Sequence, residues 1–247
     1  MVEERHYRGG LTISRKLTER LLVALQEGEF SDSVRLPSEV DLAAHFGVSR
    51  SVIRDVLSNL ESEGFVERER GVGTTVIREI VQLQNRFDIK YEYNVLVRAT
   101  GANPSVAVKS LREETADAQL AERLKIEAGD AVIICEKCVC ADKVPVIYSI
   151  DKLPKKLMAR RDYTKLRWER SIFDLLEEEC RIVVDTDIAS LKPVIGPDEI
   201  RRELEVGDGH AVLRVDEVGY RRMGRPVLYT CGYYSDYFAF TLLRKRI

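Results

Sequence analysis

The sequence lacks the features that define several large classes of protein. No apolar run approaches the roughly 18 uninterrupted residues that a membrane-spanning helix requires, and the charged N-terminus leads into no apolar segment of the kind that starts a secretion signal. With 45% hydrophobic and 32% charged residues, the composition is that of a globular protein. The 247 residues suffice for two domains. We therefore expect a cytoplasmic protein without a membrane partner.

The five cysteines lack the even number and spacing of a disulfide framework, which favours a reducing compartment. Cys135, Cys138 and Cys140 form the one group that suggests a metal or redox site, but a zinc site normally needs a fourth ligand. On a strand, Cys138 and Cys140 would share a face, and Cys135 would lie on the other. We expect buried free thiols, no metal and no cofactor.

An excess of basic residues, which often accompanies nucleic-acid binding, is also absent. The formal net charge is −2, and residues 1–78 contain 11 Lys and Arg against 13 Asp and Glu. A prediction of DNA binding therefore has to rest on the pattern of residues.

Three helices are predicted near the N-terminus. Apolar residues recur every fourth position over 12–27, and Ser38 is a typical N-cap for a second helix. Gly47-Val48 forms a tight turn, after which Ser49 caps a third helix that ends near Gly64. Two short helices joined by a glycine-containing turn are typical of a helix-turn-helix.

The third helix has an apolar face and a polar face. The polar face carries Arg50, Ser51 and Arg54, and the two arginines lie one turn apart at the end that usually enters the major groove. A guanidinium group binds a guanine edge or a phosphate. The alternative is a small helical domain whose charged face is simply solvated.

A β-hairpin is predicted directly after this helix, over 65–69 and 74–77, with Gly71 in its turn. A hairpin in this position is a wing, and its glycines let the backbone approach DNA closely. The sequence therefore predicts a winged helix-turn-helix domain over residues 11–78.

The same region resembles the DNA-binding domain of the GntR family of bacterial regulators. The resemblance rests on an ordered string: Leu36-Pro37-Ser38-Glu39, Gly47-Val48-Ser49-Arg50, Glu63-Gly64 and Gly71-x-Gly73-Thr74. It implies that double-stranded operator DNA is the partner, and the candidate contact residues are Arg50, Ser51, Arg54, Gly71 and Arg35. Members commonly have an arginine where this sequence has Val40, so DNA affinity or operator sequence would differ.

The C-terminal half contains an internal duplication with an offset of 80 residues, which grows to 81 near the end. Each copy reads strand, short helix, strand, hairpin turn, strand, which predicts a mostly antiparallel sheet flanked by helices. The matching segments are Ser110-Leu111 with Ser190-Leu191, Gly129-x-Ala131-Val132 with Gly209-x-Ala211-Val212, and Pro145-Val146-Ile147-Tyr148 with Pro226-Val227-Leu228-Tyr229.

This half resembles the UTRA effector domain of the HutC subfamily. The helix–hairpin repeat carries the resemblance, together with Ala141-Asp142-x-x-Pro145, Leu153-Pro154 and Asp236-Tyr237-Phe238-x-Phe240. It implies an α+β protein in which the winged helix-turn-helix precedes an antiparallel sheet with flanking helices, similar to chorismate lyase. We expect a linker over 79–90, and an effector-binding and dimerisation domain over 91–247.

The resemblance also implies where an effector binds. Members that bind phosphorylated sugars use two arginines of one strand with a serine and a tyrosine of the middle helix, and the matching residues are Lys137, Val139, Ser171 and Phe173. Tyr91, Glu92, Tyr93 and Asn94 replace small hydroxylated residues near the ligand. A carboxylate there would repel phosphate, whereas aromatic rings could stack on a ring or face a cation. The alternative is that the tyrosines only pack the domain junction.

Together these features predict a ligand-responsive regulator, with repression as the family's usual mode. It would bind a palindromic operator as a homodimer and respond to a small polar metabolite other than a sugar phosphate. Two alternatives remain: the C-terminal half only dimerises, or it is an enzyme of chorismate-lyase-like fold. The sequence offers no nucleophile–base pair for the latter, so we do not expect an enzyme.

Overall fold

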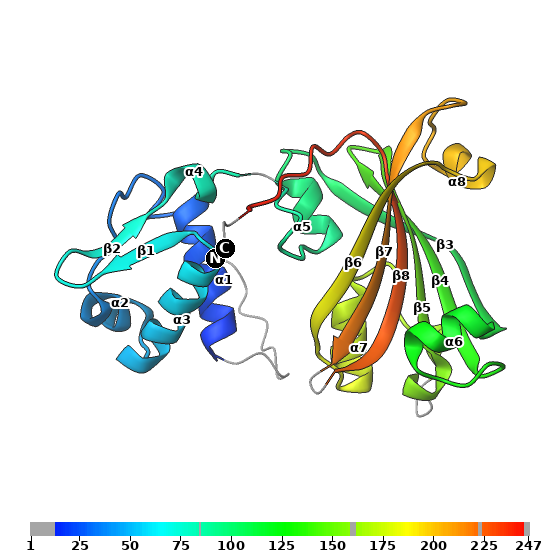
Figure 1. The fold of residues 1–247 in the computed structure, drawn as a ribbon, viewed down its shortest axis with the longest axis horizontal. Helices are drawn as coiled ribbons and strands as arrows, with labels where there is room; N and C mark the ends of the chain where they lie inside the picture. Colours follow the sequence, from blue (N-terminus) through cyan, green and yellow to red (C-terminus); the bar gives the residue numbers. More distant parts are fainter. Residues whose placement is uncertain (1–12, 84, 159–161, 222–223, 245–247) are drawn as a thin grey trace. The chain divides into compact units, whose positions relative to one another are not determined.

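The computed structural model describes residues 13–83, 85–158, 162–221 and 224–244. The chain divides into two compact units, and the boundary between them in the sequence lies between residues 84 and 85 (Figure 1). The first two residues of the predicted DNA-binding domain, 11 and 12, lie outside the described residues.

The first unit contains the predicted helices and hairpin. Its elements are α1 (Ile13–Gln26), α2 (Glu39–Phe46), α3 (Arg50–Ser62), β1 (Val66–Glu69), β2 (Gly73–Val76) and α4 (Arg78–Val81). The strands β1 and β2 are antiparallel and form the wing.

Local interactions fix the two helices of the helix-turn-helix. The Ser38 side chain accepts a hydrogen bond from the Asp41 amide at the start of α2, and Ser49 accepts one from the Val52 amide at the start of α3. Between them Gly47 has a φ of +66°, a left-handed conformation that glycine adopts without steric cost. The apolar face of α3 is buried against the unit's core through Ile53, Val56, Leu57 and Leu60.

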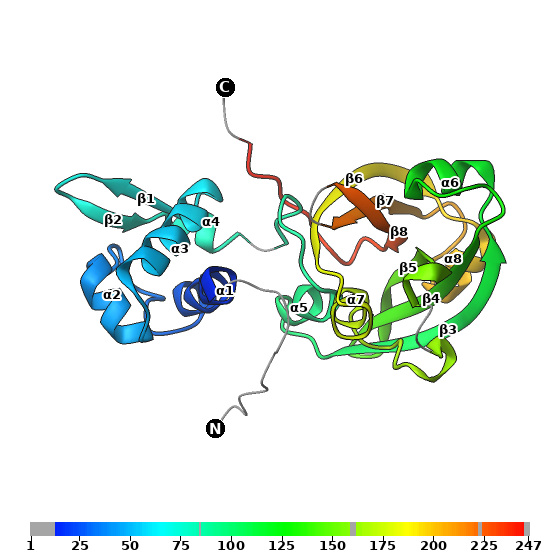
Figure 2. The ribbon, with the colours of Figure 1, turned by 90° about the horizontal axis from the view of Figure 1, so that it is seen from below.

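The second unit is a six-stranded sheet with helices on both faces, an α+β arrangement as predicted (Figure 2). The strands are β3 (Pro104–Thr115), β4 (Ala131–Ala141), β5 (Val144–Pro154), β6 (Val184–Ile195), β7 (Ala211–Arg221) and β8 (Arg225–Tyr234). They lie in the order β3-β4-β5-β8-β7-β6, and every neighbouring pair is antiparallel. The helices are α5 (Tyr93–Arg98), α6 (Ala118–Leu124), α7 (Ile172–Cys180) and α8 (Asp198–Glu203), with short 3-10 turns at Lys155–Met158 and Tyr163–Lys165.

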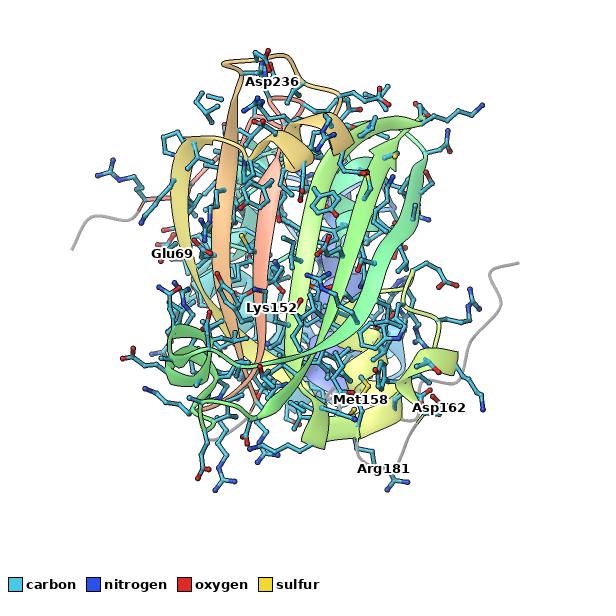
Figure 3. All side chains as sticks on the ribbon, turned by 90° about the vertical axis from the view of Figure 1, so that its right-hand side faces the viewer. Glu69, Lys152, Met158, Asp162, Arg181 and Asp236 are labelled. Atoms are coloured by element: carbon cyan, nitrogen blue, oxygen red, sulfur yellow. The ribbon has the colours of Figure 1, made fainter. Side chains whose placement is uncertain are left out.

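The strand register confirms the internal duplication. Leu111 pairs with Cys135 in the first copy, and Leu191 pairs with Val215 in the second. The two copies meet where β5 pairs with β8, so the sheet has an approximate two-fold axis through its centre. Figure 3 shows the strands side by side, with Asp236 at one end of the sheet and Met158 at the other.

The alternation of side chains along β4 divides the unit into two layers. Val132, Ile134 and Cys138 pack with α6 and α8 on one face. Cys135 packs with α7 on the opposite face, and Val139 packs with α5 beside it. The cysteines are free thiols, and their division between the two faces is as predicted. Lys137 lies on the sheet face that α5 and α7 cover, so its charged side chain is placed between these two helices.

The residues expected to form a linker, 79–90, divide between the two units. Val81 is buried in the first unit as part of α4. Arg86 is 1% exposed in the second unit and pairs with Asp88, and the Phe87 amide donates to the Thr241 carbonyl. None of the described helices is both long and apolar enough to cross a membrane.

Candidate DNA-binding surface and effector pocket

The polar face of α3 presents the predicted DNA-contacting side chains at its N-terminal end. Arg50 and Arg54 are each 61% exposed, and both guanidinium groups approach one carboxylate oxygen of Glu39, at 3.7 Å and 3.3 Å. Ser51 is exposed, and its hydroxyl lies 2.8 Å from that of Ser49. An exposed ion pair of this kind contributes about 0–1 kcal/mol, so Glu39 holds the two arginines only weakly and both guanidinium groups remain exposed.

The wing lies beside this helix in the same unit, and its turn is built on glycine. Gly71 has a φ of +84° and Gly73 a φ of +112°, and a Cβ atom at either position would meet nothing within 4 Å. The glycines are therefore required by the backbone conformation rather than by crowding. Arg35 is exposed next to the wing, where it forms an isolated bridge with Thr75.

An ion pair fastens the wing to α3. The backbone amide of Arg68, on β1, donates to Glu61 of α3 at 3.0 Å, and the guanidinium donates to the same carboxylate at 2.8 and 2.6 Å. These hydrogen bonds from Arg68 hold the pKa of Glu61 below its usual value. The orientation of the wing relative to α3 is thus fixed by side chains as well as by the turn.

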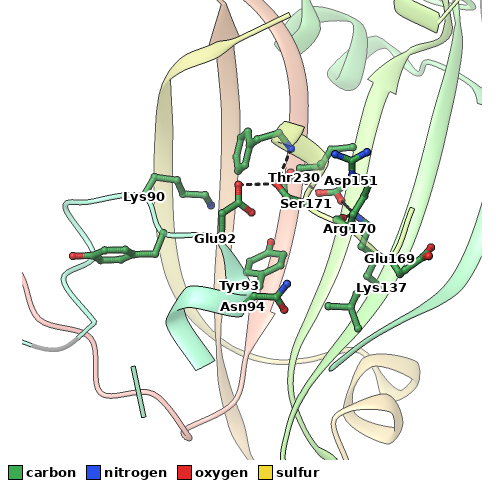
Figure 4. Close-up of a pocket in the computed structure, with 14 residues that line it drawn as sticks. Lys90, Glu92, Tyr93, Asn94, Lys137, Asp151, Glu169, Arg170, Ser171 and Thr230 are labelled. Carbon is green, nitrogen blue, oxygen red and sulfur yellow. Dashed lines mark hydrogen bonds and ion pairs between the residues drawn. The ribbon is translucent and has the colours of Figure 1, made fainter. Parts of the chain in front are cut away.

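A pocket in the second unit brings together all seven residues that were predicted to bind an effector. It lies between α5 and α7 on one face of the sheet and encloses about 470 Å³, including its open mouth (Figure 4). The predicted residues in its lining are Tyr91, Glu92, Tyr93, Asn94, Lys137, Ser171 and Phe173. The lining also includes residues that were not predicted: Lys90, Val106, Asp151, Glu169, Arg170, Ile172 and Thr230.

A buried polar cluster forms the floor of the pocket. Lys137 pairs with Asp151 across β4 and β5 at 3.1 Å, and their side chains are only 3% and 1% exposed. Asp151 also accepts a hydrogen bond from the Thr230 hydroxyl at 2.8 Å, and the Lys137 ammonium donates to the Arg170 carbonyl at 3.3 Å. The cluster is therefore internally neutralised, and Lys137 is not a free cation.

The start of α7 forms one wall. Ser171 caps the helix by accepting hydrogen bonds from the amides of Phe173 and Asp174, and its hydroxyl donates to Glu92 at 2.6 Å. Figure 4 shows this hydrogen bond between Glu92 and Ser171 as a dashed line. Burial raises the pKa of Glu92, and the hydrogen bond from Ser171 opposes this effect.

Lys90 anchors the segment that enters the second unit. Its ammonium lies 2.6 Å from both carboxylate oxygens of Glu217 on β7, and Glu217 is 5% exposed. Asp187 of β6 lies slightly farther away, at 3.9 Å. The internal duplication aligns Glu217 with Lys137, so the equivalent positions of the two copies carry opposite charges.

One signal in the sequence could have identified Asp151 as a pocket residue. Along β5, Ile147, Ser149, Asp151 and Leu153 alternate with residues of the other face, and all four are fully or almost fully buried. Polar residues at inward positions of a strand require partners. No such local signal marks Lys90, because its partner Glu217 lies 127 positions away in the sequence.

A winged helix-turn-helix with exposed arginines, joined to a separate unit that contains a polar pocket, defines a transcription regulator with an effector domain. Comparison with family models agrees: residues 13–76 match bacterial regulatory proteins of the gntR family, and residues 99–237 match the UTRA domain. The chain therefore belongs to the gntR family and carries a UTRA domain, the combination found in its HutC subfamily.

Curated relatives and solved structures show similar architecture along most of the chain. The mannosyl-D-glycerate transport/metabolism system repressor MngR of Escherichia coli is 25% identical over 239 residues, which cover 96% of this chain and 98% of the relative. The transcriptional repressor NagR of Bacillus subtilis is 23% identical and covers 85% and 84%. The structure of YydK from Bacillus subtilis has a TM-score of 0.72 at 18% identity and covers 95% and 100%. PhnF from Mycobacterium smegmatis has a TM-score of 0.60 at 21% identity and covers 95% and 99%.

Proposed function

We propose that this protein is a repressor that binds a palindromic operator as a homodimer and is released or retuned by a small polar metabolite. The observation that carries the proposal is the pair of exposed arginines at the N-terminal end of α3, beside a wing. Repression is supported by relatives that are named repressors.

The pocket supports control by a ligand. Residues 90–94 form part of its lining, and they follow directly on the segment that joins the two units. An effector that contacts Glu92 or Tyr93 would change the position or mobility of this segment. The spacing of the two recognition helices would then no longer match that of the operator half-sites. The affinity for the operator would fall by an amount set by the difference in DNA-binding free energy between the effector-free and effector-bound states.

The alternatives have less support. A C-terminal unit that only dimerises would not need a polar pocket with a buried Lys137–Asp151 pair, because such a pair is costly to desolvate. An enzymatic role has less support because the matching family models and the named relatives are those of transcription regulators. We also propose a cytoplasmic location, because an operator-binding protein must share a compartment with the chromosome.

The DNA-binding role is tested by replacing both arginines, Arg50→Ala with Arg54→Ala. Each lost base contact costs about 1–3 kcal/mol, so the double variant should lose its preference for the operator over random DNA. The measurement is a gel shift at fixed salt on an operator selected from random-sequence DNA. Arg202→Ala, an exposed arginine on α8 of the second unit, serves as a surface control away from the DNA-binding unit. Full specific affinity in the double variant would place the recognition surface elsewhere.

A further inference from the structure

The charges that line the effector pocket are almost all compensated by neighbouring side chains. Each of its three cationic side chains has a carboxylate partner within 3.1 Å: Lys90 with Glu217, Lys137 with Asp151, and Arg170 with Glu178. Glu169, at the rim, pairs with Arg167 at 3.2 Å. An anionic ligand would therefore find no unpaired cation among the described residues of the lining.

Glu92 is the exception. Its hydrogen-bond partner is the uncharged hydroxyl of Ser171, at 2.6 Å, and within the described part of the chain no cationic group lies within 4 Å of its carboxylate. Burial raises its pKa, although the hydrogen bond from Ser171 and the more distant charges of Lys90 and Lys137 oppose this effect. A ligand that brings a positive charge to this position would supply the missing partner.

The aromatic rings beside Glu92 already accommodate a cation. The Lys90 ammonium lies 5.8 Å from the centre of the Tyr93 ring and 5.9 Å from the centre of the Phe173 ring. Ring faces attract cations through their quadrupole. Lys90 itself is held by Glu217 and does not reach Glu92, so the carboxylate remains available next to rings that favour positive charge.

We propose that the effector carries a protonated amino group, which pairs with Glu92 against Tyr93 and Phe173, and that the pocket discriminates against phosphorylated ligands. The inference rests on the proposed effector function of this pocket and adds the chemical class of its ligand. Glu92 is the residue that determines this specificity, because it is the charged side chain of the described lining that lacks an ion-pair partner of its own. The start of α7 cannot bind a ligand phosphate in the same arrangement, because the Glu92 carboxylate already occupies the Ser171 hydroxyl.

The test uses methylammonium chloride and inorganic phosphate as probes on the full chain, without DNA. Amide chemical shifts of residues 92 and 171–173, and that of the Glu92 carboxyl carbon, report on the pocket. Methylammonium should change them saturably in the wild type and bind at least about tenfold more weakly to Glu92→Gln, because a charge-assisted hydrogen bond is lost. The variant is isosteric and retains an acceptor for Ser171, so the fold is preserved.

Glu203→Gln is the matched control, because it makes the same substitution in the same unit at a carboxylate that lies outside the pocket lining and already pairs with Lys109 at 2.7 Å. It should bind methylammonium as the wild type does. Saturable phosphate binding to the wild type, equal methylammonium affinity in Glu92→Gln, or no saturable methylammonium effect in the wild type would each overturn the inference. The gel shift with operator DNA contains neither probe, so it tests DNA binding separately from the ligand class. A protein that binds its operator but ignores methylammonium would refute only the ligand class.

Discussion

At the scale of single residues, Val40 marks a difference between this DNA-binding surface and the pattern of its family. The side chain is 54% exposed on the first turn of α2. It follows Glu39, whose carboxylate approaches both Arg50 and Arg54. An exposed valine gains nothing from packing and cannot bind a phosphate, so this position is free to accept a charged side chain.

We expect Val40→Arg to strengthen DNA binding through one additional phosphate contact. Each such contact releases condensed counterions, so the slope of log affinity against log salt should steepen by about 0.9. Because phosphates carry no sequence information, affinity should rise for operator and random DNA alike. The measurement is a salt series of gel shifts, with Val40→Leu as the uncharged control. A slope that matches the wild type would mean that the start of α2 lies away from the DNA backbone.

The pocket illustrates which residues sequence reasoning can find. The resemblance to the UTRA domain identifies Ser171, Glu92 and Lys137 by their positions, and the capping pattern at Ser171 is an additional local signal. The neutralisation of Lys137 is not predictable in this way. Its partner Asp151 depends on the register of β4 with β5, which the sequence leaves open until the strands are paired.

At the scale of elements, the wing is held by its buried valines, by backbone hydrogen bonds to the segment 34–36 and by an ion pair with α3. The strands β1 and β2 have only four residues each, and a hairpin this short is marginally stable alone. Glu61 and Arg68 connect it to a helix whose apolar face is fully buried. This pair is therefore one of several contacts that set the position of the wing relative to the recognition helix.

Glu61→Gln should destabilise the first unit near neutral pH, by about 1 kcal/mol at most because the pair is partly exposed. Arg68 lowers the pKa of Glu61 from its ordinary value of 4.5. The stabilisation is therefore complete above pH 4.5, the ordinary pKa of a glutamate. It is lost as the pH falls through the lower pKa that Glu61 has in the folded protein. The difference in unfolding temperature between wild type and variant should accordingly shrink in acid.

The control is Glu67→Gln, which changes an exposed carboxylate on the same strand. It should leave the unfolding temperature close to that of the wild type at each pH. A difference for Glu61→Gln that stays constant from neutral to acidic pH would show that the ionised carboxylate is not what holds the wing.

At the scale of the whole molecule, the internal duplication was predictable, whereas the division between the units was not. A repeat with an offset of 80 residues predicts the same order of elements in both copies. The strand register agrees, because residues that are equivalent in the two copies have equivalent partners on the neighbouring strand. The polar composition of residues 79–90 predicts a linker that includes Arg86 and Asp88. They are part of the second unit because they pair with each other and the neighbouring backbone pairs with the segment near Thr241.

One recognition helix contacts few base pairs, so specific binding by this architecture requires two copies of α3. In the proposed homodimer the second contact is intramolecular once the first has formed. The affinity gained from the second contact is then set by the effective concentration of the second α3 near its half-site. This concentration depends on the distance and the rotational phase between the half-sites rather than on new contacts.

An operator with both half-sites should therefore bind the full chain about 100-fold or more tightly than DNA with a single half-site. Inserting about 5 base pairs between the half-sites turns one of them to the opposite side of the duplex and should abolish this gain. Inserting about 10 base pairs restores the phase and should recover part of it, to the extent that the joint between the units stretches. The measurement is a gel shift with the four DNAs at one salt concentration. If all of them bind equally, each chain acts alone, and the two-fold model of recognition is wrong.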